Sequence, residues 1–220
     1  MQSVDLIPLI EFSPFHFARA DRAHPQQSGL EAPDEWSRYW FESLADAGIH
    51  ELAPFQDTWF VRADTVLRPK TIRLLIDITL RDMDVVEDFE DAPPLEAGFA
   101  LAVDGVGLVM PGCCCDFGNL ESWRSIIHAP DGRWQQIWIG HPWVFARHYQ
   151  GLVEITVPAE SESPREVALT VSTELLIDAV ERAEAEVHAV CERVRRVLKA
   201  AYPVHVVNRL LPQLMDSGRS

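Results

Sequence analysis

Three of the four cysteines in this chain are consecutive: Cys113, Cys114 and Cys115. They follow Pro111-Gly112 in a segment that the surrounding pattern places between a strand and a helix. A thiolate in such a place can act as a metal ligand or as a nucleophile. Because interior packing seldom requires a run of cysteines, this segment is the first candidate for a functional site.

A zinc site is one alternative. On an extended backbone Cys113 and Cys115 point to the same face, and His141 can complete the ligand set. Structural zinc sites usually combine two ligand pairs, each with two to four residues between its members, and the second pair is missing here. The pattern therefore predicts no bound cofactor, and the metal site of Cys113, Cys115 and His141 stays an alternative.

A cysteine nucleophile is the next alternative. Cys115 lies just before a predicted helix, where a thiolate is stabilised, and His141 can approach it in the fold. The adjacent carboxylate of Asp116 would raise the thiol pKa, and no local signature of a known cysteine hydrolase is present. The sequence therefore nominates no catalytic residue.

A second distinctive stretch runs through Gly140, His141, Pro142 and Trp143. Glycine before His-Pro-Trp predicts a bend that turns an imidazole and an indole toward one place, although a hydrogen-bonded histidine in a bulge is the favoured interpretation. The two stretches supply nine motif residues of unassigned role, which are Cys113, Cys114, Cys115, Asp116, Trp123, Gly140, His141, Pro142 and Trp143.

The cysteine run is expected to be structural. Thiols behave as small hydrophobic groups, and a Pro-Gly turn leaves little room for larger side chains. We therefore expect at least two of the three thiols to be buried, beside Trp123 or the bend at 141–143.

The elements around these stretches follow from periodicity and turn residues. Helices are expected at 33–47, after the cysteine run from 120 to 127, and from 172 to 202, where Pro203 ends the last one. Apolar residues repeat along the long helix with steps of four and three, and this seam should be buried while Glu184, Glu192 and Arg193 stay exposed. The seam comprises Leu176, Val180, Ala183, Val187, Val190, Val194, Val197 and Ala201.

Strands are expected wherever apolar and polar residues alternate. Residues 4–12 predict an edge strand because Pro8 cannot donate to a central ladder. Asp104-Gly105 predicts a hairpin over 99–110. The remaining strands are expected at 57–64, 70–81, 133–139, 143–149, 151–157 and 166–172, and an exposed acidic run is expected at 82–91.

This order of elements predicts one α+β domain over residues 1–220. It should contain a mainly antiparallel sheet of five or more strands and a long C-terminal helix. That helix should cover the sheet, and a contact at one of its ends is compatible with a homodimer.

The charge limits the choice of partners. With 34 Asp and Glu against 19 Lys and Arg, the net charge is −15. Nucleic acids and anionic membranes attract basic proteins, so neither is expected as a partner, whereas a basic protein would be attracted. No apolar run of about 20 residues and no signal-peptide pattern is visible, so we expect a cytoplasmic protein with reduced thiols.

The stretches at 111–123 and 138–143 together resemble a group of uncharacterised bacterial proteins, some of them similar to immunity proteins of toxin systems. That group carries a Pro-x-Cys-Cys-x-Asp-Leu turn before a tryptophan helix, and Phe117 replaces the leucine here. The resemblance implies a small acidic binding protein and transfers no catalytic residue. We therefore expect a non-enzymatic protein that binds another protein and neutralises a toxin, with an enzyme or metal protein centred on Cys113–Cys115 and His141 as the alternative.

Overall fold

The computed structural model describes residues 3–81, 83, 89–160 and 166–215. Two antiparallel sheets of four strands each, together with helices that include a long one near the C-terminus, confirm the α+β class. The expected single sheet of five or more strands is instead divided between these two sheets. One buried apolar cluster contains residues of both, among them Ile10, Phe99, Ile137 and Val153. The extent of the domain, 1–220, remains a prediction.

The first sheet has the order β2-β1-β3-β4, from β1 (Val4–Glu11), β2 (Phe60–Arg62), β3 (Ala97–Val103) and β4 (Val106–Val109). The prediction that 4–12 is an edge strand was wrong, because β1 lies between β2 and β3. Pro8 is tolerated there because β2 pairs only with Leu9 to Glu11. No strand of this sheet lies beside Pro8 on the β2 side, so the missing N–H has no ladder partner to lose.

The hairpin predicted at 99–110 is confirmed by the pairing of β3 with β4. Asp104 and Gly105 both have positive φ, 51° and 81°, as a two-residue turn of this kind requires. β4 is an edge strand of the sheet, and its Val106 and Leu108 are exposed.

The second sheet has the order β5-β6-β7-β8, from β5 (Gln135–Ile137), β6 (Val144–Tyr149), β7 (Leu152–Thr156) and β8 (Val167–Ser172). All four match strands expected from the sequence. The bend between β5 and β6 carries Gly140 to Trp143, so the second sheet positions that motif.

Residues 70–81 do not form a strand but belong to helix α3 (Pro69–Thr79). The buried positions Ile72, Leu75, Ile76 and Leu80 recur every three or four residues, which is the helical period. Pro69 begins the helix in the position where its missing N–H costs nothing. Of the strand expected at 57–64, only β2 is present.

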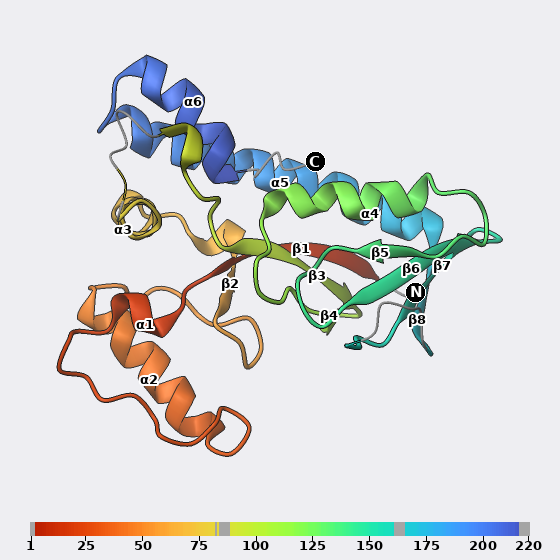
Figure 1. The fold of residues 1–220 in the computed structure, drawn as a ribbon, viewed down its shortest axis with the longest axis horizontal. Coiled ribbons are helices and arrows are strands. Elements are labelled where there is room, and N and C mark those ends of the chain that lie inside the picture. The colour runs from red at the N-terminus through yellow and green to blue at the C-terminus, as the bar shows by residue number, and fades with distance from the viewer. Residues whose placement is uncertain (1–2, 82, 84–88, 161–165, 216–220) are drawn as a thin grey trace.

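Figure 1 shows α4 (Leu120–Ile127) and α5 (Thr173–Lys199) on the same side of the sheets, while α1 (Pro14–Phe17) and α2 (Pro33–Asp46) form a separate projection. α5 packs against β1, α3 and α4, which confirms that it covers a sheet. The chain continues beyond Pro203 into α6 (Val204–Met215), a helix that the sequence reading did not include. α6 packs against α5 through a buried apolar face.

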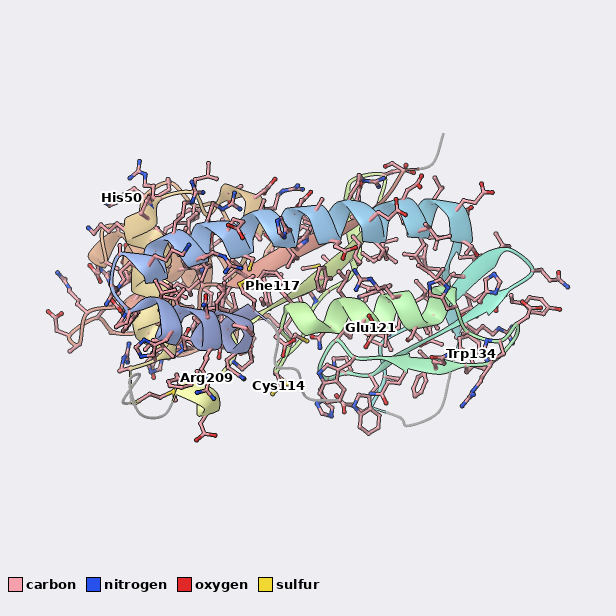
Figure 2. All side chains as sticks on the ribbon, turned by 90° about the horizontal axis from the view of Figure 1, so that it is seen from above. His50, Cys114, Phe117, Glu121, Trp134 and Arg209 are labelled. Carbon is pink, nitrogen blue, oxygen red and sulfur yellow. The ribbon has the colours of Figure 1, made fainter. Side chains whose placement is uncertain are left out.

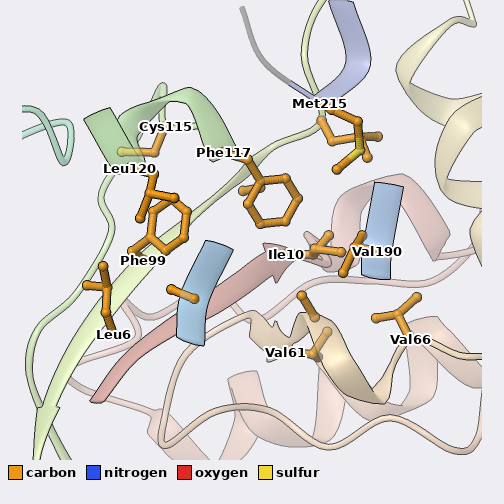
Figure 3. Packing of buried hydrophobic residues seen from close by; sticks show 14 of the residues in the cluster. Leu6, Ile10, Val61, Val66, Phe99, Cys115, Phe117, Leu120, Val190 and Met215 are labelled. Carbon is orange, nitrogen blue, oxygen red and sulfur yellow. The ribbon is translucent and has the colours of Figure 1, made fainter. Parts of the chain in front are cut away.

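The apolar seam of α5 is buried over most of its length. Leu176, Val180, Ala183, Val190 and Val194 are buried, whereas Val187 and Val197 are half-buried and Ala201 is exposed. Figure 3 shows Val190 in the core together with Ile10, Val61 and Phe117.

The polar positions of α5 follow the prediction only in part. Glu184 is exposed as expected, and Glu192 is half-buried. Arg193 is also half-buried because its side chain turns toward the chain before α3 and donates to the Ala63 carbonyl at 3.1 Å.

Two further predictions concern the first half of the chain. α2 confirms the helix at 33–47, and Gly48 ends it with φ of 76°. The acidic run predicted at 82–91 lies largely outside the described residues; within it, Phe89–Asp91 forms a 3-10 turn. None of the helices in the described part of the chain is long and apolar enough to cross a membrane.

Candidate functional site: an exposed thiol and tryptophan surface

The two motif stretches lie against each other, backbone to backbone. The N–H of Gly112, which follows β4, donates to the carbonyl of Ile139, which follows β5, at 2.6 Å. A Cβ on Gly112 would lie 2.4 Å from the carbonyl oxygen of His141, so no larger residue fits. The contact therefore joins the loop after the first sheet's hairpin to the bend inside the second sheet.

Gly140 makes the reciprocal approach. It has φ of 81°, which confirms the bend predicted there, and a Cβ on it would lie 2.1 Å from the carbonyl oxygen of Cys113. Only glycine combines this backbone conformation with this proximity. On one side of each glycine the neighbour is buried, Pro111 and Ile139, and on the other side the neighbour is exposed, Cys113 and His141.

The cysteines do not behave as expected. Cys113 and Cys114 are exposed, and only Cys115 is buried, so the prediction of at least two buried thiols was wrong. Cys114 has a positive φ of 62°, which turns the chain at the tip of the loop. At the end of the cysteine run, the N–H of Ala97, the first residue of β3, donates to the Cys115 carbonyl at 3.1 Å. This hydrogen bond holds Cys115 against the start of β3.

Cys115 belongs to the core. Figure 3 shows its side chain beside Leu120 and Phe99. Burial raises the pKa of its thiol to about 12, with a smaller contribution from the nearby Asp116 carboxylate. A thiol of this kind stays protonated near neutral pH and is inert. The alternative of a nucleophilic Cys115 finds no support in this environment, and Asp116 raises the pKa of the thiol as the sequence predicts.

Cys113 is the thiol that the fold activates. The backbone N–H of His141 and then its ring hydrogen-bond to the Cys113 sulfur, and both lower the pKa of this thiol from its ordinary value. The neighbouring Cys114 also hydrogen-bonds to it, and this interaction raises the pKa of Cys114. The two exposed thiols therefore differ, with the pKa of Cys113 lowered and that of Cys114 raised.

Aromatic side chains complete the surface. Trp138 is 41% exposed, and its indole N–H donates to the carbonyl of Cys114 at 3.3 Å. The rings of His141 and Trp143 lie 5.3 Å apart, and His141 and Pro142 are exposed. Figure 2 shows the Cys114 side chain at the periphery of the molecule, clear of α4. Two thiols, an imidazole and the indole of Trp138 thus lie on the exposed area, while Trp143 is half-buried beside His141.

Two motif residues have structural roles instead. The Asp116 carboxylate accepts from the Gly118 N–H at 2.8 Å, and the Asn119 side chain accepts from the Asp116 N–H at 2.9 Å. This reciprocal cap begins the 3-10 turn Phe117–Asn119, which leads into α4. Trp123 on α4 is fully buried. Asp116 and Trp123 therefore hold the loop without contributing to its exposed surface.

The zinc alternative does not assemble. In the part of the chain that the structure describes, no three His, Cys, Asp or Glu side chains are grouped as a metal site. Cys113 is exposed whereas Cys115 is buried in the core, so the two do not present their sulfurs to one ion.

The residue that the sequence reading left out of the site is Trp138. A signal was present: Ile137 and Ile139 are buried on either side of it, so strand alternation turns Trp138 outward. An exposed tryptophan next to the Gly-His-Pro-Trp bend could have been included on that ground.

No protein-family model, curated protein or solved structure matches this chain significantly. The resemblance to immunity proteins therefore stays an expectation from the sequence alone. A proposed function has to be argued from the geometry of the surface.

Proposed function

We propose that this protein binds another protein through the surface made by Cys113, Cys114, Trp138, His141 and Pro142, which we call the thiol–tryptophan surface. The observation that carries the proposal is the exposure of Trp138 on a loop fixed by backbone contacts. Tryptophan is among the residues most enriched in the energetic centres of protein interfaces. An indole left in water, yet anchored through its N–H to Cys114, supports a binding role over a packing role.

Rigidity adds to this argument. A binding loop loses affinity when it must be ordered on association, at a cost of about 0.5–1.5 kcal/mol for each immobilised side chain. Here the Gly112–Ile139 hydrogen bond and the close approach of Gly140 to Cys113 fix the two loops before any partner arrives. The surface is therefore preorganised.

The charge supports a basic partner. A net charge of −15 accelerates the encounter with a positively charged protein, and this acceleration weakens as salt is added. The sequence resemblance suggests a toxin as the partner, and the charge of the chain favours a basic one. In that case the protein would act by occupying a surface that the toxin needs, without chemistry of its own.

A photo-crosslinking amino acid at position 138 tests the proposal. The protein that crosslinks from the native cell is identified and purified, and its affinity for the unmodified chain is then measured by calorimetry. We expect Trp138→Ala to weaken this affinity about thirtyfold or more, in keeping with about 2 kcal/mol or more for an interface hot spot. Tyr149→Ala is the matched control, because Tyr149 is 39% exposed and lies outside the surface.

Equal affinity of the Trp138→Ala and parent proteins would overturn the proposed surface. If the partner is a toxin, co-expression should restore growth of cells that produce it, and Trp138→Ala should lose this protection.

A second candidate function is thiol chemistry at Cys113, favoured by its hydrogen bonds to His141. In thiol–disulfide exchange the Cys113 thiolate attacks one sulfur of a disulfide, an S–S bond forms, and the other sulfur leaves as a thiolate. With oxidised glutathione as the disulfide, intact mass should show a mixed disulfide with one glutathione, released with reduced glutathione, that forms faster in the parent than in His141→Ala. An exchange rate equal to that of free cysteine at the same pH would contradict this candidate.

A further inference from the structure

A cavity of about 430 Å³ lies between the start of α3 and the last two turns of α5, at a distance in the fold from the loops of the thiol–tryptophan surface. Ligand pockets in proteins measure roughly 300–1,000 Å³, so this volume suits a small molecule. Its apolar wall includes Leu67, Ile72 and Val197, and its polar side chains are Arg73, Arg193 and Arg196.

The charge of this cavity is opposite to that of the chain. The sequence has 34 acidic against 19 basic residues, yet three arginines and no Asp or Glu line the cavity. Apart from the arginines, the lining side chains are aliphatic or proline and offer no hydrogen-bonding group. The wall is therefore suited to an apolar body that carries a negative group at one end.

One of the three arginines is already paired with a carboxylate of the protein. Arg73 forms an ion pair with Asp77 at 2.7 Å, and its guanidinium lies over the Tyr202 ring, 5.6 Å from the centroid. It borders the cavity, but its charge is balanced within α3.

Among the described residues, neither Arg193 nor Arg196 forms an ion pair, although the charge of Asp64 acts on Arg193 and favours its protonated form. Arg193 donates through one terminal nitrogen to the Ala63 carbonyl, while its Nε is buried and makes no hydrogen bond within the described structure. Arg196 donates only to the carbonyl of Glu192, at 3.3 Å. Burial lowers the pKa of Arg193, which means that its charge is held at a cost.

The helix macrodipole explains part of this arrangement. Cations near a helix C-terminus are stabilised by its partial negative charge, and Arg196 lies in the last turn of α5. The dipole does not explain why Arg193 turns inward and leaves a buried N–H without an acceptor. Both guanidinium groups line the cavity, so an anion bound in it would meet two positive charges.

We propose that this cavity binds an amphipathic monocarboxylate, a fatty acid of medium chain length. Its carboxylate lies against Arg193 and Arg196, and its acyl chain lies along Leu67, Ile72 and Val197. The planar guanidinium matches a carboxylate with two parallel hydrogen bonds. A peptide fits less well, because its backbone amides and carbonyls would be buried against a wall that offers them no partners.

Calorimetric titration of the full chain with decanoate at pH 7.5 tests the proposal. We expect saturable binding with one site, at least tenfold tighter than that of decanol, which has the same chain length without the charge. Arg193→Gln should weaken decanoate binding at least tenfold. Arg195→Gln is the matched control, because Arg195 lies two residues after Arg193 on the same helix. It pairs with Glu192 at 3.1 Å and does not line the cavity.

Two further measurements keep the outcome decisive. Ala200→Trp places a large side chain at the cavity wall, and it should abolish binding while the circular dichroism spectrum stays that of the parent. Arg196→Gln replaces Arg193→Gln if the latter does not fold, since Arg196 is exposed. Equal affinity for decanol and decanoate, equal affinity for inorganic phosphate and decanoate, or unchanged binding by the arginine variants would each overturn the proposal.

Discussion

The sulfur of Cys113 is hydrogen-bonded to the backbone N–H and the ring of His141, although the two residues belong to loops of different sheets. This relationship lowers the pKa of Cys113, while Cys115 in the core has a pKa raised to about 12. The reactivity of neighbouring cysteines should therefore differ strongly.

Alkylation by iodoacetamide at pH 7 should label Cys113 first, Cys114 more slowly and Cys115 only after unfolding, because the thiolate is the reacting form. Peptide mass spectrometry of timed samples measures the order. His141→Ala removes the ring and should shift the pH–rate profile of Cys113 to higher pH, with about tenfold slower labelling for each unit that its pKa rises. Equal rates for Cys113 and Cys114, or an unshifted profile, would contradict this assignment.

Gly140→Ala should destabilise the protein by more than its backbone angle alone implies. Gly140 and Gly105 share φ of 81°, but an added Cβ meets the Cys113 carbonyl at Gly140 and open space at Gly105. We expect about 1–2 kcal/mol for Gly105→Ala from the left-handed conformation, and about 3 kcal/mol or more for Gly140→Ala. Urea unfolding of both variants measures the difference, and similar losses would show that the loops can move apart.

Glu11 should make stability fall as pH rises toward neutrality. Burial, with a smaller contribution from the charge of Glu96, raises the pKa of Glu11 from 4.5 to about 7 in the folded state. The folded chain therefore holds this proton more tightly than the unfolded chain. The resulting stability is complete below about pH 4.5 and is lost as pH rises through 7.

Glu11→Gln keeps the neutral form at every pH. Because Glu11 is only partly buried and water screens its charge, we expect the variant to gain on the order of 1 kcal/mol over the parent at pH 8. The gain should vanish at pH 4. Chemical unfolding at the two pH values tests this, and a gain that does not depend on pH would refute the titration of Glu11 as its cause.

The loss of stability caused by an Asp in the apolar seam of α5 should depend on how deeply the substituted position is buried. Val190 is buried in the core, whereas Val187 on the same seam is half-buried. Val190→Asp should cost about 3–5 kcal/mol, as for an unpaired buried charge, and Val187→Asp about 1 kcal/mol. Thermal unfolding compares the two. Sedimentation of each variant also tests whether the chain forms the homodimer with which this helix is compatible. A folded Val187→Asp monomer from a dimeric parent would locate the contact on this helix.

Local sequence signals predicted much of the fold. The Asp104-Gly105 turn has a strict backbone requirement that few other turns share, and the hairpin follows from it. The strand predicted at 70–81 was wrong because isoleucine and leucine at nearly every second position also satisfy the helical period of three to four. Leu75, which interrupts the strand pattern, is buried in the helix and was the informative residue. α5 ends at Lys199, before the end that the sequence predicts at 202, and Pro203 directly precedes α6, a place that proline also favours.

The candidate site was predictable only as two separate stretches. Nothing local connects Cys113 with His141, because their contact depends on how the hairpin and the second sheet pack together. The glycines at 112 and 140 carried the only hint, since a glycine can mark close backbone approach, but a sequence does not reveal which backbone approaches. The burial of Cys115 and exposure of Cys113 likewise follow from the turn at Cys114, not from residue type.

The edge strand β4 has a consequence for behaviour in concentrated solution. Its Val106 and Leu108 are exposed beside unpaired backbone groups, an arrangement that invites strands of other molecules to add to the sheet. At neutral pH, mutual repulsion between chains of charge −15 opposes this. Near the isoelectric point of about 4.8 the repulsion disappears. Acidification should therefore cause this protein to form β-rich aggregates before it unfolds, and a lysine at position 108 should delay them.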